Sequence, residues 1–297
     1  MTLPALLLGT SGLGTRPSGV EAESLADALL AAPYRGLDTS NAYAGGRSEA
    51  VLGRAIERAG GLPDGLQLVT KVDADPVTKV LDGDRVRRSV EESLDKLGLD
   101  HLPLLHLHDP YTVSFSEAVG PGGAVGALVA LREEGVVDAI GIAAGPLNLL
   151  SAYVGTGAFD AVLSHNRFTL VDRGAEVLFG DARSRGMTVI NAAPFGGGLL
   201  AGSTRAAQKY AYRDASADLL AHVDRIRALC SGWQVPIGAA ALWFSRRSPL
   251  VDATVVGIPS LARLEELSAL VAAEPSPQFF AALDGLGPAP LAQEAES

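Results

Sequence analysis

Short apolar runs alternate with longer amphipathic segments along this chain. Segments of the second kind, such as 85–98 (RVRRSVEESLDKLG) and 126–135 (GALVALREEG), repeat their apolar residues at the period of an α-helix. The second of them ends on a glycine, as helices often do. The apolar runs are short and continuous, which is typical of strands buried on both faces. Eight such strands are predicted, at residues 5–9, 35–38, 66–71, 102–108, 137–143, 161–166, 187–193 and 253–257.

Strands of this kind, separated by helices, pair in parallel. Eight repeats of the unit predict an α/β fold that closes into a (β/α)8 or TIM barrel, a single domain over residues 1–287. The alternative, an open doubly wound sheet, needs a Gly-x-Gly-x-x-Gly fingerprint directly after its first strand. The glycines of 9–19 (GTSGLGTRPSG) lack that spacing, so the barrel is favoured. Residues 288–297, rich in Pro, Ala and Glu, are predicted to form a disordered tail.

Composition excludes several function classes. The 297 residues include 24 Lys and Arg against 34 Asp and Glu, a net charge of −10 with no basic block, so nucleic-acid binding is not expected. No run of about 18 apolar residues predicts a membrane span. The apolar start, 1–15, lacks the basic residues of a signal peptide and reads as the first strand. The lone cysteine, Cys230, excludes a disulfide within the chain and fits a cytoplasmic protein; we expect it in the core.

Polar residues mark the ends of three predicted strands. Asp38 ends the second strand, Lys71 the third and His108 the fourth, and Tyr43 follows Asp38 in the stretch 36–43 (GLDTSNAY). In a barrel, the carboxyl ends of the strands meet at one mouth, where active sites are built. Taken singly, each residue has an ordinary explanation as a turn cap, a solvated cation or a core histidine. Four of them on neighbouring strands predict a site.

The residue types in this group suit proton transfer. Lys71 beside Asp38 would form a partly buried ion pair, which is retained for function more readily than for stability. The ammonium favours the phenolate, so we expect the pKa of Tyr43 to fall from about 10 toward working pH. A metal site is not predicted, because His106 and His108 share a strand face but no third ligand is evident.

These residues and their surroundings resemble the aldo-keto reductase family. The four residues lie in 36–56 (GLDTSNAYAGGRSEAVLGRAI), 68–72 (LVTKV) and 104–110 (LLHLHDP). The similarity continues through 189–202 (VINAAPFGGGLLAG) and 255–267 (VVGIPSLARLEEL), so it covers nearly the whole chain. The most similar branch contains the bacterial aldose 1-dehydrogenases of the L-fucose and D-threo-aldose type and the related pyridoxal and L-galactose dehydrogenases.

The resemblance implies hydride transfer between a nicotinamide cofactor and a carbonyl or carbinol carbon. Tyr43 would protonate the carbonyl oxygen in reduction and remove the hydroxyl proton in oxidation. Lys71, paired with Asp38, would tune Tyr43, and His108 would donate to or orient the same oxygen. The branch favours oxidation of an aldose to its lactone. Two alternatives stay open: an NADPH-dependent reductase of aldehydes or ketones, and a non-catalytic subunit that senses the cofactor, against which the intact set of four argues.

The same resemblance implies where the cofactor lies. The end of the sixth strand would hold the nicotinamide amide, the glycines after the seventh would admit a pyrophosphate, and the helix start after the eighth would meet phosphate. The expected cofactor-binding residues are His165, Asn166, Pro194, Phe195, Gly196, Gly197, Gly198, Leu199, Gly257, Ile258, Pro259, Ser260, Arg263 and Glu266. NADP-preferring members carry a basic residue near position 259, so Pro259 makes NAD the expected cofactor and NADP the alternative.

Some positions depart from the family pattern. Ala143 and Ala144 stand where many members have Ser-Asn, and Ala192 stands where many stack a tyrosine on the nicotinamide. The few residues before the first strand leave no room for the family's N-terminal hairpin, so we expect the barrel floor to be covered differently or left open. The stretch 203–213 (STRAAQKYAYR) is expected to form a solvated loop over the mouth. The oligomeric state is not predicted.

Overall fold

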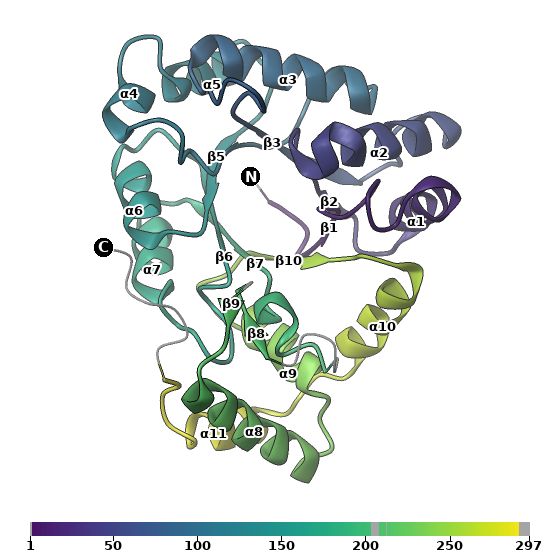
Figure 1. The fold of residues 1–297 in the computed structure, drawn as a ribbon, viewed down its shortest axis with the longest axis vertical. Helices are drawn as coiled ribbons and strands as arrows, with labels where there is room; N and C mark the ends of the chain where they lie inside the picture. Colours follow the sequence, from purple (N-terminus) through teal and green to yellow (C-terminus); the bar gives the residue numbers. More distant parts are fainter. Residues whose placement is uncertain (1, 203–207, 212, 291–297) are drawn as a thin grey trace.

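Eight parallel strands close into a barrel, and helices surround it (Figure 1). The structure is a computed structural model that describes residues 2–202, 208–211 and 213–290. Around the barrel the hydrogen-bonded strands follow the order β1-β10-β7-β6-β5-β4-β3-β2. They are β1 (Leu6–Gly9), β2 (Gly36–Asp38), β3 (Gln67–Val72), β4 (Leu105–His108), β5 (Ile140–Ala144), β6 (Ala161–His165), β7 (Thr188–Ala192) and β10 (Ala253–Gly257). The predicted (β/α)8 barrel is confirmed, and the open sheet is excluded.

The helices lie between the strands along the chain, with two more after the last strand, and they cover the outer face of the barrel (Figure 1). They are α1 (Gly19–Ala31), α2 (Arg47–Arg58), α3 (Gly83–Leu97), α4 (Phe115–Val119), α5 (Ala124–Glu133), α6 (Leu147–Gly155), α7 (Glu176–Ser184), α8 (Ala217–Gly232), α9 (Ile237–Arg246), α10 (Leu261–Ala272) and α11 (Pro277–Asp284). Cap residues fix their ends: the Asp82 side chain accepts from the Arg85 N–H at the start of α3, and Gly98 ends that helix with a φ of 66°. The two helices expected at 85–98 and 126–135 are α3 and α5.

Successive side chains along each strand point alternately into the barrel and out toward the helices, and this produces two apolar layers. In β1, Leu7 points into a cluster that fills the barrel interior, whereas Leu6 and Leu8 belong to the larger cluster between strands and helices. Leu3, which precedes β1, also belongs to the interior cluster. Leu3, ahead of the first strand, therefore packs in the barrel interior.

Some boundaries differ from the sequence prediction. The fourth strand starts at Leu105 rather than at 102, because Leu102 makes only an isolated bridge to Val137. A short antiparallel pair, β8 (Lys209–Tyr210) and β9 (Arg213–Asp214), was not predicted and falls in the expected mouth loop, of which residues 203–207 and 212 lie outside the described residues. In the predicted tail, residues 291–297 also lie outside them.

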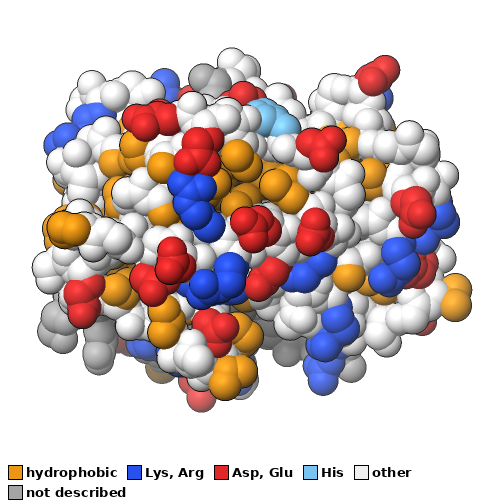
Figure 2. Space-filling view, turned by 90° about the horizontal axis from the view of Figure 1, so that it is seen from above, with side chains coloured by type: hydrophobic (Ala, Val, Ile, Leu, Met, Phe, Trp, Pro, Cys, Tyr) orange, Lys and Arg blue, Asp and Glu red, His pale blue; other side chains and the backbone are white. Residues whose placement is uncertain are grey.

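Charges on the outer surface are mixed. Figure 2, which views the molecule from above Figure 1, shows Lys and Arg side chains interspersed with Asp and Glu on this face. Arg87 of α3, for example, pairs with Glu134 after α5, with 2.6 Å between the two charged groups. Cys230 is buried in α8, as expected. None of the helices in the described part of the chain has the length and apolar character to cross a bilayer.

Helices α2 and α3 approach each other closely at a single glycine. A Cβ built on Gly53, in the middle of α2, would overlap the backbone carbonyl oxygen of Lys96 near the end of α3. Backbone atoms cannot swing aside as a flexible side chain does, so any larger residue must move a whole helix. The sequence therefore needs glycine here for packing, despite its low helix propensity.

We expect Gly53→Ala to destabilise the protein by about 1–3 kcal/mol, because the added methyl group separates two packed helices. The matched control is Gly180→Ala in the middle of α7, where nothing lies within 4 Å of the added Cβ. That substitution should be neutral or stabilising by up to about 1 kcal/mol, because alanine has the better helix propensity. Denaturant unfolding of both variants measures the difference, and equal stabilities would contradict the packing argument.

Candidate active site

The ends of β2 and β3 hold a buried ion pair. These strands are neighbours in the barrel, so Asp38 and Lys71 emerge side by side at its carboxyl end. The Lys71 ammonium donates to Asp38 Oδ1 over 2.7 Å and to the Thr39 carbonyl oxygen over 2.6 Å. The two charged side chains are only 1% and 4% exposed. Burial disfavours the ammonium, but Asp38 and Tyr43 outweigh this effect and hold the pKa of Lys71 above its ordinary value.

Tyr43 begins the 3-10 helix η1 (Tyr43–Gly46), just after β2. The Lys71 ammonium lies 4.7 Å from the centroid of its ring, and the ring meets that of His108 edge to face at 5.6 Å. Burial raises the pKa of Tyr43 to about 12, and Lys71 offsets only part of this effect. The expectation of a pKa near neutrality is therefore wrong, since the desolvation of the phenolate outweighs the nearby ammonium. At neutral pH Tyr43 is a phenol.

His108, at the end of β4, has a carboxylate partner that sequence reasoning missed. Its Nδ1 lies 2.6 Å from Oδ1 of Asp73, which directly follows β3. Burial alone would raise the pKa of Asp73, but hydrogen bonds from the His108 ring and from the loop before Tyr43 outweigh it and hold that pKa below its usual range. The signal in the sequence was the spacing: Asp73 stands two residues after Lys71, which places both on one face of the strand.

Two adjoining cavities lie at the carboxyl ends of the strands. The smaller, of about 320 Å³, is lined by Asp38, Tyr43, Lys71 and His108 and also by Asp109, Ala143, Leu163, His165, Ala192 and Val255. The larger is a groove of about 1100 Å³ between the segments that follow β1, β7 and β10 and the start of α9. Both cavities are lined by Gly9, Ser11, Ala193 and Gly257, so one opens into the other.

The groove collects most of the residues predicted to bind the cofactor. Phe195, Gly197, Gly198, Gly257, Ile258, Pro259, Ser260, Arg263 and Glu266 line it, and His165 lines the smaller cavity. Four of the predicted residues, Pro194, Gly196, Leu199 and Asn166, are buried and line neither cavity. For Gly196 and Leu199 the reason is the turn after β7: its glycines have positive φ angles, which place Gly196 against the Tyr210 ring and Leu199 in the core.

The groove fits a nicotinamide dinucleotide. At Gly257 nothing lies within 4 Å of an ideal Cβ, so the glycine leaves open space where the two cavities join. Ser260 caps α10 by accepting from the Arg263 N–H over 3.2 Å, which places the amide-rich helix start at the groove wall. Ser11 and Gly12, which follow β1, also line the groove, and the sequence analysis did not assign them to the cofactor.

Arg263 is already engaged by neighbouring groups. Its guanidinium lies 2.6 Å from the Glu266 carboxylate one turn along α10 and 4.5 Å from the centroid of the Phe195 ring. Its side chain is only 13% exposed. Arg263 is the single Lys or Arg among the described residues that line the groove.

His106 has no part in this chemistry. It is fully buried against Gly141, where an added Cβ would overlap its ring, and burial holds its pKa well below the ordinary value. It is a neutral core residue. Over the described residues, no group of three or more His, Cys, Asp and Glu side chains is arranged to hold a metal ion.

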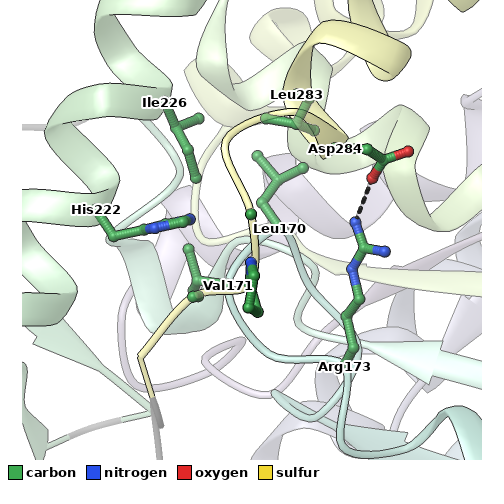
Figure 3. A pocket seen from close by; sticks show the side chains of 10 residues that line it. Leu170, Val171, Arg173, His222, Ile226, Leu283 and Asp284 are labelled. Atoms are coloured by element: carbon green, nitrogen blue, oxygen red, sulfur yellow. Dashed lines mark hydrogen bonds and ion pairs between the residues drawn. The ribbon is translucent and has the colours of Figure 1, made fainter.

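A separate cavity of about 400 Å³ lies between the loop after β6, α8 and α11 (Figure 3). Its aliphatic wall includes Leu170, Val171, Ile226 and Leu283. Its polar groups bind each other or their neighbours: Arg173 donates to Asp284 over 2.7 Å, and His222 Nδ1 pairs with Arg225 over 2.7 Å. None of the predicted site residues lines this cavity.

The model of the aldo/keto reductase family matches residues 5–288. The chain belongs to this family. Similar proteins include D-threo-aldose 1-dehydrogenase of a Pseudomonas species, 31% identical over 92% of this chain and 91% of that protein. Pyridoxal 4-dehydrogenase of Microbacterium luteolum is 29% identical, over 88% of this chain and 87% of its own. L-galactose dehydrogenase of Arabidopsis thaliana is also 29% identical, over 91% and 85%.

As a member of the aldo/keto reductase family, the protein is a nicotinamide-dependent oxidoreductase. Two of its departures from the family pattern lie in the smaller cavity. Ala143 and Ala192 line its wall, and Ala144 is buried next to the first of them. Because these three residues are alanines, this part of the cavity wall beside His165 offers no side-chain hydroxyl or amide group.

The buried ion pair gives a stability prediction. Asp38→Asn and Lys71→Met should each cost about 3–5 kcal/mol, because each leaves a buried charge without its counter-charge. The double variant should cost clearly less than the sum, since no unpaired charge remains. Denaturant unfolding of all four proteins measures the coupling. The exposed pair of Arg173 and Asp284 is the control, for which the same cycle should give at most about 1 kcal/mol. Additive losses at Asp38 and Lys71 would contradict this account.

Proposed function

We propose that the protein is an NAD-dependent dehydrogenase that oxidises the hemiacetal carbon of an aldose to a lactone. The similarity to D-threo-aldose 1-dehydrogenase and L-galactose dehydrogenase, over most of each chain, supports the substrate class. The proposal rests mainly on one observation: the cavity that holds Tyr43, Lys71 and His108 opens into the dinucleotide-sized groove past small residues. A carbon held at Tyr43 would thus lie at the inner end of that groove.

The bound nicotinamide would supply the hydride acceptor. Tyr43 and His108 would hold the reacting oxygen between them, because both side chains line the same cavity and their rings touch. Lys71 would stabilise negative charge that develops near the Tyr43 oxygen, and Asp38 would keep Lys71 charged and in place. Asp109 and His165, on other sides of the cavity, offer a hydrogen-bond acceptor and a donor to further sugar hydroxyls.

The charges along the groove support NAD over NADP. NADP carries an additional phosphate dianion, which needs a free, well-placed cation. Arg263 is paired with Glu266, and position 259 is a proline. Glu266 also lines the groove, where its carboxylate would repel a phosphate and could accept from a ribose hydroxyl.

One observation favours the reducing direction instead. Tyr43 is a phenol at neutral pH, so it is ready to donate a proton to a carbonyl oxygen. An NADPH-dependent carbonyl reductase is therefore the second candidate.

The test is a panel of aldoses and pyridoxal with NAD or NADP, followed by the absorbance of the reduced cofactor. We expect turnover of an aldose with NAD. Tyr43→Phe should lower that turnover by about two to four orders of magnitude while cofactor binding stays nearly unchanged, because only the hydroxyl is lost. Near wild-type turnover by Tyr43→Phe would show that the Tyr43 hydroxyl is not needed for catalysis. Activity confined to NADPH and carbonyl substrates would favour the reductase.

Cofactor preference gives a separate prediction. We expect the wild type to bind NAD more tightly than NADP, and Pro259→Arg to narrow the gap by improving NADP binding about tenfold, as one charge-assisted contact would. Val177→Arg adds the same charge on an exposed position of α7 and should leave the ratio unchanged. Calorimetric titration of both cofactors measures the ratio, and tighter NADP binding by the wild type would contradict the proposal.

A further inference from the structure

Asp109 presents a carboxylate to the smaller cavity directly after His108, which ends β4. Its Oδ2 lies 3.7 Å from Nε2 of His108, the ring nitrogen that does not face Asp73. Its Oδ1 is buried, and no donor in the described part of the chain hydrogen-bonds to it. A buried acceptor without a partner is unfavourable, so a ligand that supplies a donor would find it ready to bind.

The other acids of the site are already engaged. Asp38 pairs with Lys71 over 2.7 Å. Asp73 contacts Nδ1 of His108 over 2.6 Å and accepts from the Ala42 N–H over 3.1 Å. The carboxylate of Asp109 differs from both, because its closest charged or titratable neighbour lies beyond hydrogen-bond distance.

The backbone of Asp109 adopts a conformation that its sequence does not favour. Its φ is 41°, in the left-handed region, although a residue before a proline prefers an extended backbone with negative φ. The Asp109 N–H donates to the Ala143 carbonyl oxygen over 2.9 Å, which holds this conformation against the end of β5. Conformations of this kind persist only where the surroundings enforce them, and they concentrate at functional sites.

A turn-forming role does not account for the aspartate. In that role the carboxylate accepts from backbone N–H groups of its own loop, as Asp75 does from Val77 and Thr78. Within the described residues, the Asp109 carboxylate has no such bond, and its contact is the longer one with His108. The side chain is therefore available to a molecule in the cavity.

The described lining of the cavity contains no free cation that would balance this charge. Lys71 is the single Lys or Arg among these lining residues, and its ammonium is bonded to Asp38 and to the Thr39 carbonyl oxygen. An anionic group on a substrate would therefore meet Asp109 without compensation from the protein. A hydroxyl, by contrast, would donate to the carboxylate, and hydrogen bonds to ionised acceptors are the stronger ones.

We propose that Asp109 is a specificity-determining residue that accepts the hydrogen bond of a hydroxyl on the carbon next to the reacting carbon. An oxygen bonded to Nε2 of His108 would lie about 2.9 Å from it. A hydroxyl one carbon away then comes within reach of a carboxylate 3.7 Å from the same nitrogen. The inference rests on the proposed function in placing the reacting oxygen between Tyr43 and His108, but not in the direction of the reaction.

This role narrows the substrate class. The substrate is a neutral compound with oxygens on two adjacent carbons, and an aldose carries such a hydroxyl next to its hemiacetal carbon. A 2-deoxy analogue would leave the Asp109 acceptor unpaired. Sites built to bond a hydroxyl reject an analogue without it far more strongly than an apolar pocket rejects a missing methylene. An analogue with a carboxylate at the same place would be repelled.

The first experiment compares matched aldehydes in the reducing direction, so it does not depend on the oxidation of an aldose. With the reduced cofactor that the enzyme uses, the wild type should have a kcat/KM for 2-hydroxypropanal about 10²-fold above that for propanal, as one hydrogen bond to a charged group gives. In Asp109→Gly the ratio should fall close to one. Glycine tolerates the positive φ, so this variant loses the carboxylate without straining the backbone.

The second experiment uses Asp109→Asn, which keeps the shape of the side chain and removes its charge. Asparagine also tolerates the left-handed region. This variant should raise kcat/KM for glyoxylate, relative to that for glycolaldehyde, by about tenfold, because the carboxylate of glyoxylate no longer meets a like charge. Hydration of these aldehydes in water is the same for every variant, so it cancels from the comparison.

The matched control is Asp138→Asn, at the opposite end of the barrel, where the exposed Asp138 pairs with His101 ahead of β5. It should leave both substrate ratios unchanged. A binding measurement needs no turnover: NMR titration of the complex with reduced cofactor should show 1,2-propanediol binding about tenfold more tightly than 1-propanol to the wild type, and equally to Asp109→Gly. Thermal unfolding and cofactor titration check that each variant is folded, and Asp109→Asn carries the test if Asp109→Gly is not.

The outcomes separate this inference from the proposed function. Equal losses with both members of each pair would mean that Asp109 only supports His108 or its own loop, and would overturn the inference. A wild type that reduces propanal as well as 2-hydroxypropanal, or binds 1-propanol as tightly as the diol, would also overturn it. If the ratios change as expected but no aldose is oxidised, Asp109 keeps this role and the aldose assignment alone fails.

Discussion

The buried pairing of Lys71 with Asp38 is the constraint on which the rest of the site depends. Transferring either charge from water to the end of a barrel strand is unfavourable, so each needs the other within hydrogen-bond distance. The ammonium also binds the Thr39 carbonyl oxygen, which fixes the first residue after β2. The pair thereby fixes the direction in which the loop leaves the strand. The loop in turn places the ring of Tyr43 next to the Lys71 ammonium.

The mouth of the barrel contains two carboxylates with different partners. Asp38 faces a cation that stays charged, and it holds this cation under the tyrosine ring. Asp73 faces the imidazole of His108 at the end of the neighbouring strand β4. Because both acids also contact residues 39–42, either directly or through Lys71, the two pairs share one loop. The geometry at the tyrosine is therefore determined jointly by β3, β4 and the loop after β2.

The sequence was informative where regular geometry decides the structure. Parallel strands in a barrel bring their carboxyl ends together, so Asp38, Lys71 and His108 could be placed at one mouth from strand ends alone. The spacing of Asp73 from Lys71 places both residues on one strand face, but the contact between Asp73 and His108 also depends on the path of the chain after β3, which the sequence pattern does not describe. The pKa of Tyr43 depends on how deeply its hydroxyl is buried and how near it lies to Lys71. Burial raises this pKa and Lys71 lowers it, and the sequence alone does not show which effect is larger. After β7, the left-handed glycines decide which residues face the groove.

The close approach of α2 and α3 at Gly53 limits which parts of this enzyme can change when its substrate range changes. Gly53 sets the spacing of these helices on the outside of the barrel, and α3 supplies Arg85 and Ser89, which hold the backbone of Asp73. The packing of α2 against α3 on the outside of the barrel therefore determines where Asp73 lies relative to His108. Changes in substrate range, in evolution or in the laboratory, should come from substitutions in the loops after β4 and β6, because these loops can change without altering the packing of α2 against α3.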